Sequence, residues 1–136
     1  MTTGDVVVSD PGNGRVVILD SSMNIRVENV LGTNRSDGIR GLTTDISDNI
    51  YVIDTSGRPG EIIKKFDRNG MPLNLKFGYI GGLQPGYFSN PTDIAIDNLT
   101  GDIYITDSGN NRVQRFNANG VFIGEFGQIW YRSRKL

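Results

Sequence analysis

Short apolar runs separated by turn-forming residues recur along the whole chain. Runs such as Ile50–Ile53 and Ile103–Ile105 are flanked by Gly, Asn and Asp, and none approaches the roughly 20 residues of a membrane-spanning helix. The Asn-Gly pairs at 69–70 and 119–120 supply the positive φ angles of tight hairpins. This pattern predicts an all-β chain of short antiparallel strands.

The same strand pattern occurs three times. The segment Gly101–Asp107 matches Asp48–Asp54 and Gly4–Asp10, and each is followed by a Gly-rich turn and two further strands. One more strand precedes two of the copies, at Gly41–Asp45 and Asp93–Asp97. Two copies therefore have four predicted strands each, and the first copy lacks its innermost strand.

One predicted strand is apolar on both faces, since Ile50, Tyr51, Val52 and Ile53 follow one another. Such a strand must be covered on both sides. Sheets stacked face to face around an axis provide this cover for every repeat, and a small residue such as Gly41 suits the crowded position near that axis. The pattern therefore favours a propeller over a two-layer sandwich.

These residues resemble the NHL repeat family. The resemblance rests on the Pro-x-x-Ile-Ala-Ile-Asp strand that begins at Pro91 and on the Asp-Ser-Gly-Asn-Asn-Arg-Val stretch that begins at Asp107. It implies β-propeller blades of four antiparallel strands, usually six in a ring. The expected blades are residues 4–37, 38–89 and 90–127, within a repeat region of residues 1–127, and the tail 128–136 fits no repeat.

Three blades are too few to close around an axis, because propellers typically have four to eight. An open arc would leave two apolar blade faces uncovered. One resolution is a homodimer that completes a six-bladed ring, since closed two-fold assemblies are common. The other is that the chain is a piece of a longer propeller or an engineered half-propeller, and the sequence leaves this open.

The composition argues against several kinds of binding site and catalytic site. Fourteen Lys and Arg residues face fifteen Asp and Glu, which argues against binding of nucleic acid through a basic surface. Cysteine and histidine are absent, so thiolate metal sites, the commonest metal ligand and the commonest general base are missing. We therefore expect no catalytic residues, metal, cofactor or membrane partner, and the composition indicates no compartment.

An aspartate closes the same strand in each copy, at Asp10, Asp54 and Asp107. One interpretation is a ring of carboxylates that binds a hard cation. The other, favoured by the recurrence, is a structural role in which the carboxylate caps the following turn and pairs with the next arginine. Arg15 and Arg112 share that register. Ile62 stands there in the second copy, which indicates that a cation in this role is not needed in every blade.

Six residues in predicted loops are candidates for contact with a ligand or protein partner, because loops on a rigid scaffold carry function and because aromatic and Arg side chains are favoured at interfaces. The six, expected on one face of the propeller, are Arg35, Arg40, Arg58, Tyr79, Tyr87 and Asn110.

The leading hypothesis is a non-catalytic module that binds a protein or a ligand and assembles with itself. The resemblance also implies two alternatives, part of a calcium-dependent propeller hydrolase or lyase and an RNA-binding NHL domain. The NHL-like lyases use histidine around their metal, and this chain has no histidine.

Overall fold

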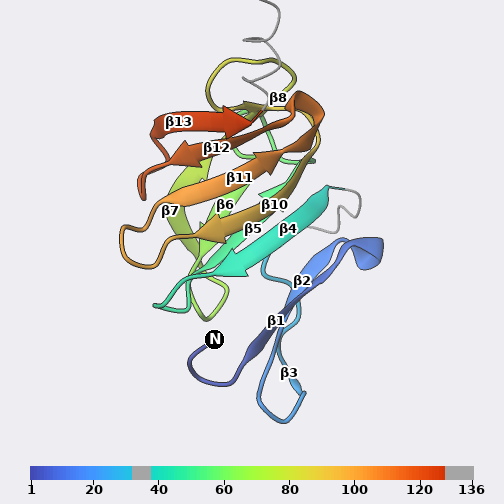
Figure 1. Cartoon of the computed structure of the whole chain (residues 1–136). Helices are drawn as coiled ribbons and strands as arrows, with labels where there is room; N and C mark the ends of the chain where they lie inside the picture. The colour runs from blue at the N-terminus through green and yellow to red at the C-terminus, as the bar shows by residue number, and fades with distance from the viewer. Residues whose placement is uncertain (32–37, 128–136) are drawn as a thin grey trace, which may run out of the picture.

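The computed structural model describes residues 1–31 and 38–127, and these form three antiparallel meanders in chain order (Figure 1). The first sheet contains β1 (Val6–Asp10), β2 (Arg15–Leu19) and β3 (Ile25–Val27). The second contains β4 (Ile39–Thr44), β5 (Ile50–Asp54), β6 (Ile63–Phe66) and β7 (Pro72–Phe77). The third contains β10 (Pro91–Ile96), β11 (Ile103–Asp107), β12 (Arg112–Phe116) and β13 (Phe122–Gly127).

The connections are short. The 3-10 turns η1 (Pro11–Asn13) and η2 (Ser108–Asn110) follow β1 and β11. Between the second and third sheets, β8 (Tyr79–Ile80) and β9 (Tyr87–Phe88) form a small parallel pair. Within the described residues, no helix has the length and apolar character needed to cross a membrane.

The predicted all-β class and four-stranded antiparallel sheets are confirmed for the second and third sheets. Among the described residues, the first sheet has three strands and begins with β1, the counterpart of β5 and β11. The expected blade ranges each contain one meander, and the predicted tail 128–136 lies outside the described residues. The sequence thus located the strands of the three antiparallel sheets, because the turn residues recur with the strands, but it did not predict the β8–β9 pair.

The sheets pack face to face, and β5 is buried along its whole length. Ile50 and Val52 belong to an apolar cluster shared with β2, whereas Tyr51 and Ile53 belong to a second cluster shared with β11 and β12. Successive side chains of a strand point to opposite faces, so one strand contributes to both clusters. This confirms that the apolar run 50–53 is covered on both sides.

The inner strands β4 and β10 lie against each other (Figure 1). At Gly41 of β4, a Cβ atom would lie 3.1 Å from the carbonyl oxygen of Thr92 in β10. A side chain at this position would need β10 to shift by a few tenths of an ångström, so glycine suits this close approach. Crowding at the inner position agrees with the small residues expected there.

The hairpin turns repeat one arrangement of hydrogen bonds. The side-chain oxygen at the start of each turn accepts the backbone amides two and four residues further on, at Asp20, Asp45, Asp67 and Asn117. Bonds from the backbone and side chain of Asn24 lower the pKa of Asp20. Burial raises the pKa of Asp45, but hydrogen bonds from Asn49 outweigh it, so the net pKa is lowered. Side chains thus complete these turns where a backbone pattern alone would leave amides unpaired.

Because the pKa of Asp20 is lower in the folded than in the unfolded chain, its turn stabilises the fold fully above the ordinary pKa of 3.8 and loses this contribution as the pH falls through the folded value. We expect Asp20→Asn, which copies Asn117, to keep both amide bonds but to remove this pH dependence. Urea unfolding followed by circular dichroism should show a smaller acid-induced loss of stability for the variant. An unchanged loss would contradict the assignment.

Candidate functional site

A buried ion pair lies at the end of the third sheet. The register of β11 and β12 places Asp107 opposite Arg112. Arg112 Nε donates to Asp107 Oδ2 at 2.8 Å, and the side chains are 7% and 0% exposed. Asn110 Nδ2 and Gln114 Nε2 donate to the same oxygen at 2.9 and 3.2 Å. A buried carboxylate requires this degree of compensation, because its desolvation is costly.

The same pair fixes the connection between the second and third sheets, residues 78–90, which we call the 78–90 loop. Arg112 Nη1 donates to the carbonyl oxygen of Leu83 at 2.7 Å, and Nη2 donates to that of Tyr87 at 2.8 Å. Asp107 Oδ1 accepts the backbone amide of Ser89 at 2.7 Å. The loop is therefore held through its main chain, which leaves its side chains available for contact.

Asp10 and Arg15 form the equivalent pair in the first sheet. Arg15 Nε lies 2.8 Å from Asp10 Oδ2, but both side chains are about 30% exposed, at 31% and 29%. Arg15 Nη1 also pairs with Glu28. The hydrogen bond from Arg15 lowers the pKa of Asp10. The pair has the same geometry as Asp107 and Arg112 but is more exposed to water.

The second sheet corrects the expectation that the cation is not needed in every blade. Ile62 stands where the other sheets have arginine, but Lys64, two residues further on, places its Nζ 3.0 Å from Asp54 Oδ2. Burial raises the pKa of Asp54, and hydrogen bonds from Ser56 and Lys64 outweigh it, so the net pKa is lowered. Each of the three aspartates therefore has a cationic partner.

The predicted capping of the following turn also needs correction. Asp54 accepts the amide of Ser56 in its own turn, at 3.1 Å. The side chains of Asp10 and Asp107 make no capping hydrogen bond to the 3-10 turns that follow them, and Asp107 instead binds the amide of Ser89, which precedes its sheet. Asp107 therefore links its own sheet to the connection that precedes it. Within residues 1–31 and 38–127, no three acidic side chains are grouped as a metal site would need.

Three of the six candidate contact residues meet at the 78–90 loop. The rings of Tyr79 and Tyr87 stack with centroids 4.8 Å apart, and Asn110 Nδ2 donates to the carbonyl oxygen of Gly82 at 3.1 Å. Arg58 is exposed in the turn before Gly60, whose amide bonds to the carbonyl oxygen of Gly78 at the start of the loop.

The other two candidates are not part of this group. Arg40 is exposed on β4, where its Nη1 approaches the carbonyl oxygen of Ile39. Arg35 lies outside the described residues. The structure therefore links Tyr79, Tyr87 and Asn110 directly, with Arg58 in the adjoining turn.

Two residues of the loop escaped the sequence-based search. Ile80 and Leu83 are 49% and 56% exposed, and Tyr79 beside them is 42% exposed. We call Tyr79, Ile80 and Leu83 the loop patch. The available signal was their position, because apolar side chains next to Gly81 and Gly82 cannot belong to a regular buried strand. Exposed apolar residues on a fixed loop are available for contact with a protein.

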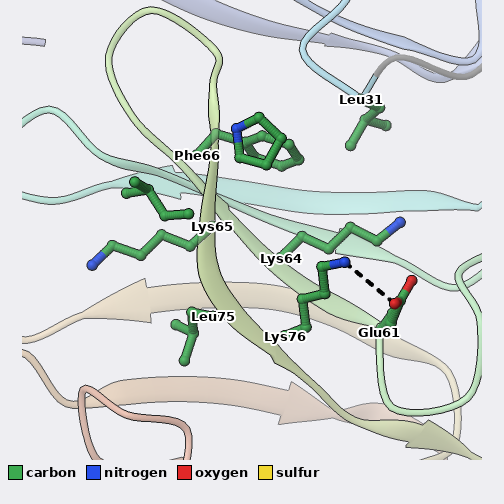
Figure 2. Close-up of a pocket in the computed structure, with 9 residues that line it drawn as sticks. Leu31, Glu61, Lys64, Lys65, Phe66, Leu75 and Lys76 are labelled. Atoms are coloured by element: carbon green, nitrogen blue, oxygen red, sulfur yellow. Dashed lines mark hydrogen bonds and ion pairs between the residues drawn. The ribbon is translucent and has the colours of Figure 1, made fainter.

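A cavity of about 150 Å³ lies beside the outer part of the second sheet, lined by Leu31, Phe66 and several lysines (Figure 2). Lys64 and Lys76 line it from neighbouring strands. Lys65 also lines it, and its Nζ lies 5.2 Å from the centroid of the Tyr51 ring. Lys76 Nζ lies 3.3 Å from Glu61 Oε1, and Lys64 pairs with Asp54. Acidic partners thus compensate the charges of Lys64 and Lys76.

The two arginine pairs allow a matched comparison. We expect Arg112→Ala to lower the free energy of unfolding by about 3 kcal/mol, because it leaves the buried carboxylate of Asp107 without its cation. Arg15→Ala should cost much less, since water reaches Asp10. Urea denaturation of both variants checks this difference. Equal losses of stability in the two variants would show that burial of the Asp107–Arg112 pair does not add to its contribution.

The chain resembles known proteins in sequence and in structure. A model of the NHL repeat matches residues 88–116, from the end of β9 to the end of β12. The chain is 31% identical over 118 residues to peptidyl-glycine alpha-amidating monooxygenase A of Xenopus laevis, an alignment covering 83% of this chain and 12% of that protein. The chain thus spans about an eighth of that curated relative.

Solved structures share the fold. Streptogramin B lyase superposes with a TM-score of 0.65 and 16% identity, over 93% of this chain and 38% of the lyase. A catalytically inactive histidine-to-alanine variant of virginiamycin B lyase from Staphylococcus aureus, solved with quinupristin, gives a TM-score of 0.55 at 15% identity over the same shares. At this identity the likeness concerns the fold alone. The match shows that residues 88–116 are an NHL repeat, and they lie within a chain of recurring antiparallel sheets that resemble propeller blades.

Proposed function

We propose that the chain is a non-catalytic propeller module that binds a protein partner through the loop patch and completes its blades by self-association. The observation that carries the binding role is the 78–90 loop, which Arg112 and Asp107 fix through main-chain groups while Tyr79, Ile80 and Leu83 stay exposed. A fixed loop loses little conformational entropy on binding. Aromatic and apolar side chains supply contact area.

The described polar groups support binding rather than catalysis. General acid-base chemistry needs an acid and a base with different environments in one pocket. Here Asp10, Asp54 and Asp107 each pair with their own cation, and Asp102 pairs with Arg115. The lyase whose histidine is replaced is inactive, and these 136 residues contain no histidine.

The binding role can be tested with a phage library of random peptides selected against the intact chain. We expect the selected peptides to lose affinity at least about tenfold, or about 1.4 kcal/mol, for Leu83→Ser and Ile80→Ser. Leu99→Ser is the matched control, because Leu99 is 97% exposed in the hairpin between β10 and β11. Peptides that bind all three variants equally, or no selected peptides, would overturn the loop patch as the contact surface.

The second candidate, part of a metal-dependent propeller hydrolase or lyase, draws on the likeness to the lyase structures and to the amidating monooxygenase. Calorimetric titration of the intact chain with calcium and with zinc separates the two functions. Binding of either metal that Asp54→Asn or Asp107→Asn weakens would favour the enzyme.

RNA binding is a poorer fit because Lys64, Lys76, Arg112 and Arg115 have acidic partners. Affinity for single-stranded RNA at low salt would reverse this ranking.

A further inference from the structure

The face of the first sheet that points away from the second is apolar, and its β1 side chains are exposed. Val6 and Val8 on this face are 43% and 38% exposed. The residues at the same positions of β5 and β11 are all 0% exposed, namely Ile50, Val52, Ile103 and Ile105. In the second and third sheets the preceding sheet covers these positions. The first sheet therefore has the same type of packing face as the other two sheets. Among the described residues, no preceding sheet covers it.

The inner edge of the same sheet is also open. Among the described residues β1 pairs with β2 alone, whereas β5 and β11 each have an inner partner. An open groove of about 310 Å³ separates β1 from β4, lined by Met1, Asp5, Val6 and Val7 on one side and by residues 42–44 on the other. Since β4 packs against β10, an inner strand of the first sheet would lie in this groove.

The outward face of the third sheet provides the opposite half. Phe126, opposite Val113 in β12, is 53% exposed. Its counterpart Phe77, opposite Ile63, is partly buried, and its ring lies 4.7 Å from that of Phe116 in the next sheet. The residue at the position of Phe116 in the first sheet is Leu19, the partner of Val6 in β1. The chain thus carries both halves of one type of sheet-to-sheet contact, at its two ends.

The hydrogen bonds of Arg15 match only part of those that Arg112 makes. Arg112 donates to Asp107, to Glu125 and to carbonyl oxygens of the preceding loop. Arg15 donates to Asp10 and Glu28, the counterparts of the two acidic partners, and among the described residues it contacts no carbonyl group of a preceding connection. The Asp10–Arg15 pair therefore has donor groups placed for the main chain of a preceding sheet.

We propose that the outward face of the first sheet binds the outward face of the third sheet of a second copy, with Leu19 of one copy against Phe126 of the other. Two such contacts join two sets of three sheets into a closed ring of six, within the range of propellers. The inference specifies the self-association in the proposed function and rests on it. The loop patch is outside this contact, so the two can fail separately.

Sedimentation equilibrium of the intact chain tests the assembly. We expect a mass twice that of the chain, and we expect Leu19→Lys and Phe126→Glu each to raise the dissociation constant at least about tenfold, since each buries an unpaired charge. Leu99→Lys, with its exposed position outside the contact, is the control for added charge. A mixture of the two charged variants should regain affinity, because the introduced lysine of one copy then faces the introduced glutamate of the other.

Cross-linking tests which faces meet, with substitutions that introduce no charge. The chain contains no cysteine of its own, so each introduced cysteine is the single thiol of its variant. A short bifunctional maleimide should join Leu19→Cys to Phe126→Cys in a mixture of the two variants. Either variant alone should give no dimer, because the contact joins different faces and the two Leu19 positions lie on opposite sides of the ring. A monomeric mass at all concentrations, or cross-linking of Leu19→Cys to itself, would overturn the proposal. A monomer whose Leu83→Ser variant still loses peptide binding would leave the binding role standing.

Discussion

Face-to-face packing of the sheets is the interaction on which the rest of the structure depends. The second sheet contributes apolar side chains to clusters on both of its faces, so it can exclude water from its core only with a neighbour on either side. The full burial of β5 shows this condition satisfied, and the exposed Val6 and Val8 show it unsatisfied at one end. Stability in such an array is a property of contacts between repeats more than of any repeat alone.

The ion pairs at the strand ends connect this packing to the surface. A pair such as Asp107 and Arg112 is costly to bury by itself. Its remaining hydrogen-bonding groups are satisfied by the connection that arrives from the preceding sheet. The same polar groups thus close the gap between sheets and determine the path of the loop above them. Lys64 reaching Asp54 shows that the fold requires the charge and its position, and accepts a different side chain to supply them.

The sequence predicted the strands and the repeat register well, because apolar alternation and Asn-Gly or Asp-led turns are local signals. It also paired Asp10 with Arg15 and Asp107 with Arg112, since five residues across a tight turn leave little choice of partner. It could not find the Lys64 replacement, because that cation comes from a different register position. Nor did it find Ile80 and Leu83. The glycines beside them indicate a loop, but the path of that loop depends on Arg112, which lies about 30 residues away along the chain.

The main-chain attachment of the 78–90 loop has a consequence for how such a protein can change. Carbonyl and amide groups do not depend on the side chain, so substitutions of the exposed Tyr79, Ile80 and Leu83 leave the anchoring bonds of the loop intact. Selection can then alter the recognised surface without first rebuilding the scaffold. Specificity and folding become largely separable traits, which is the condition under which one repeat architecture can acquire many different partners.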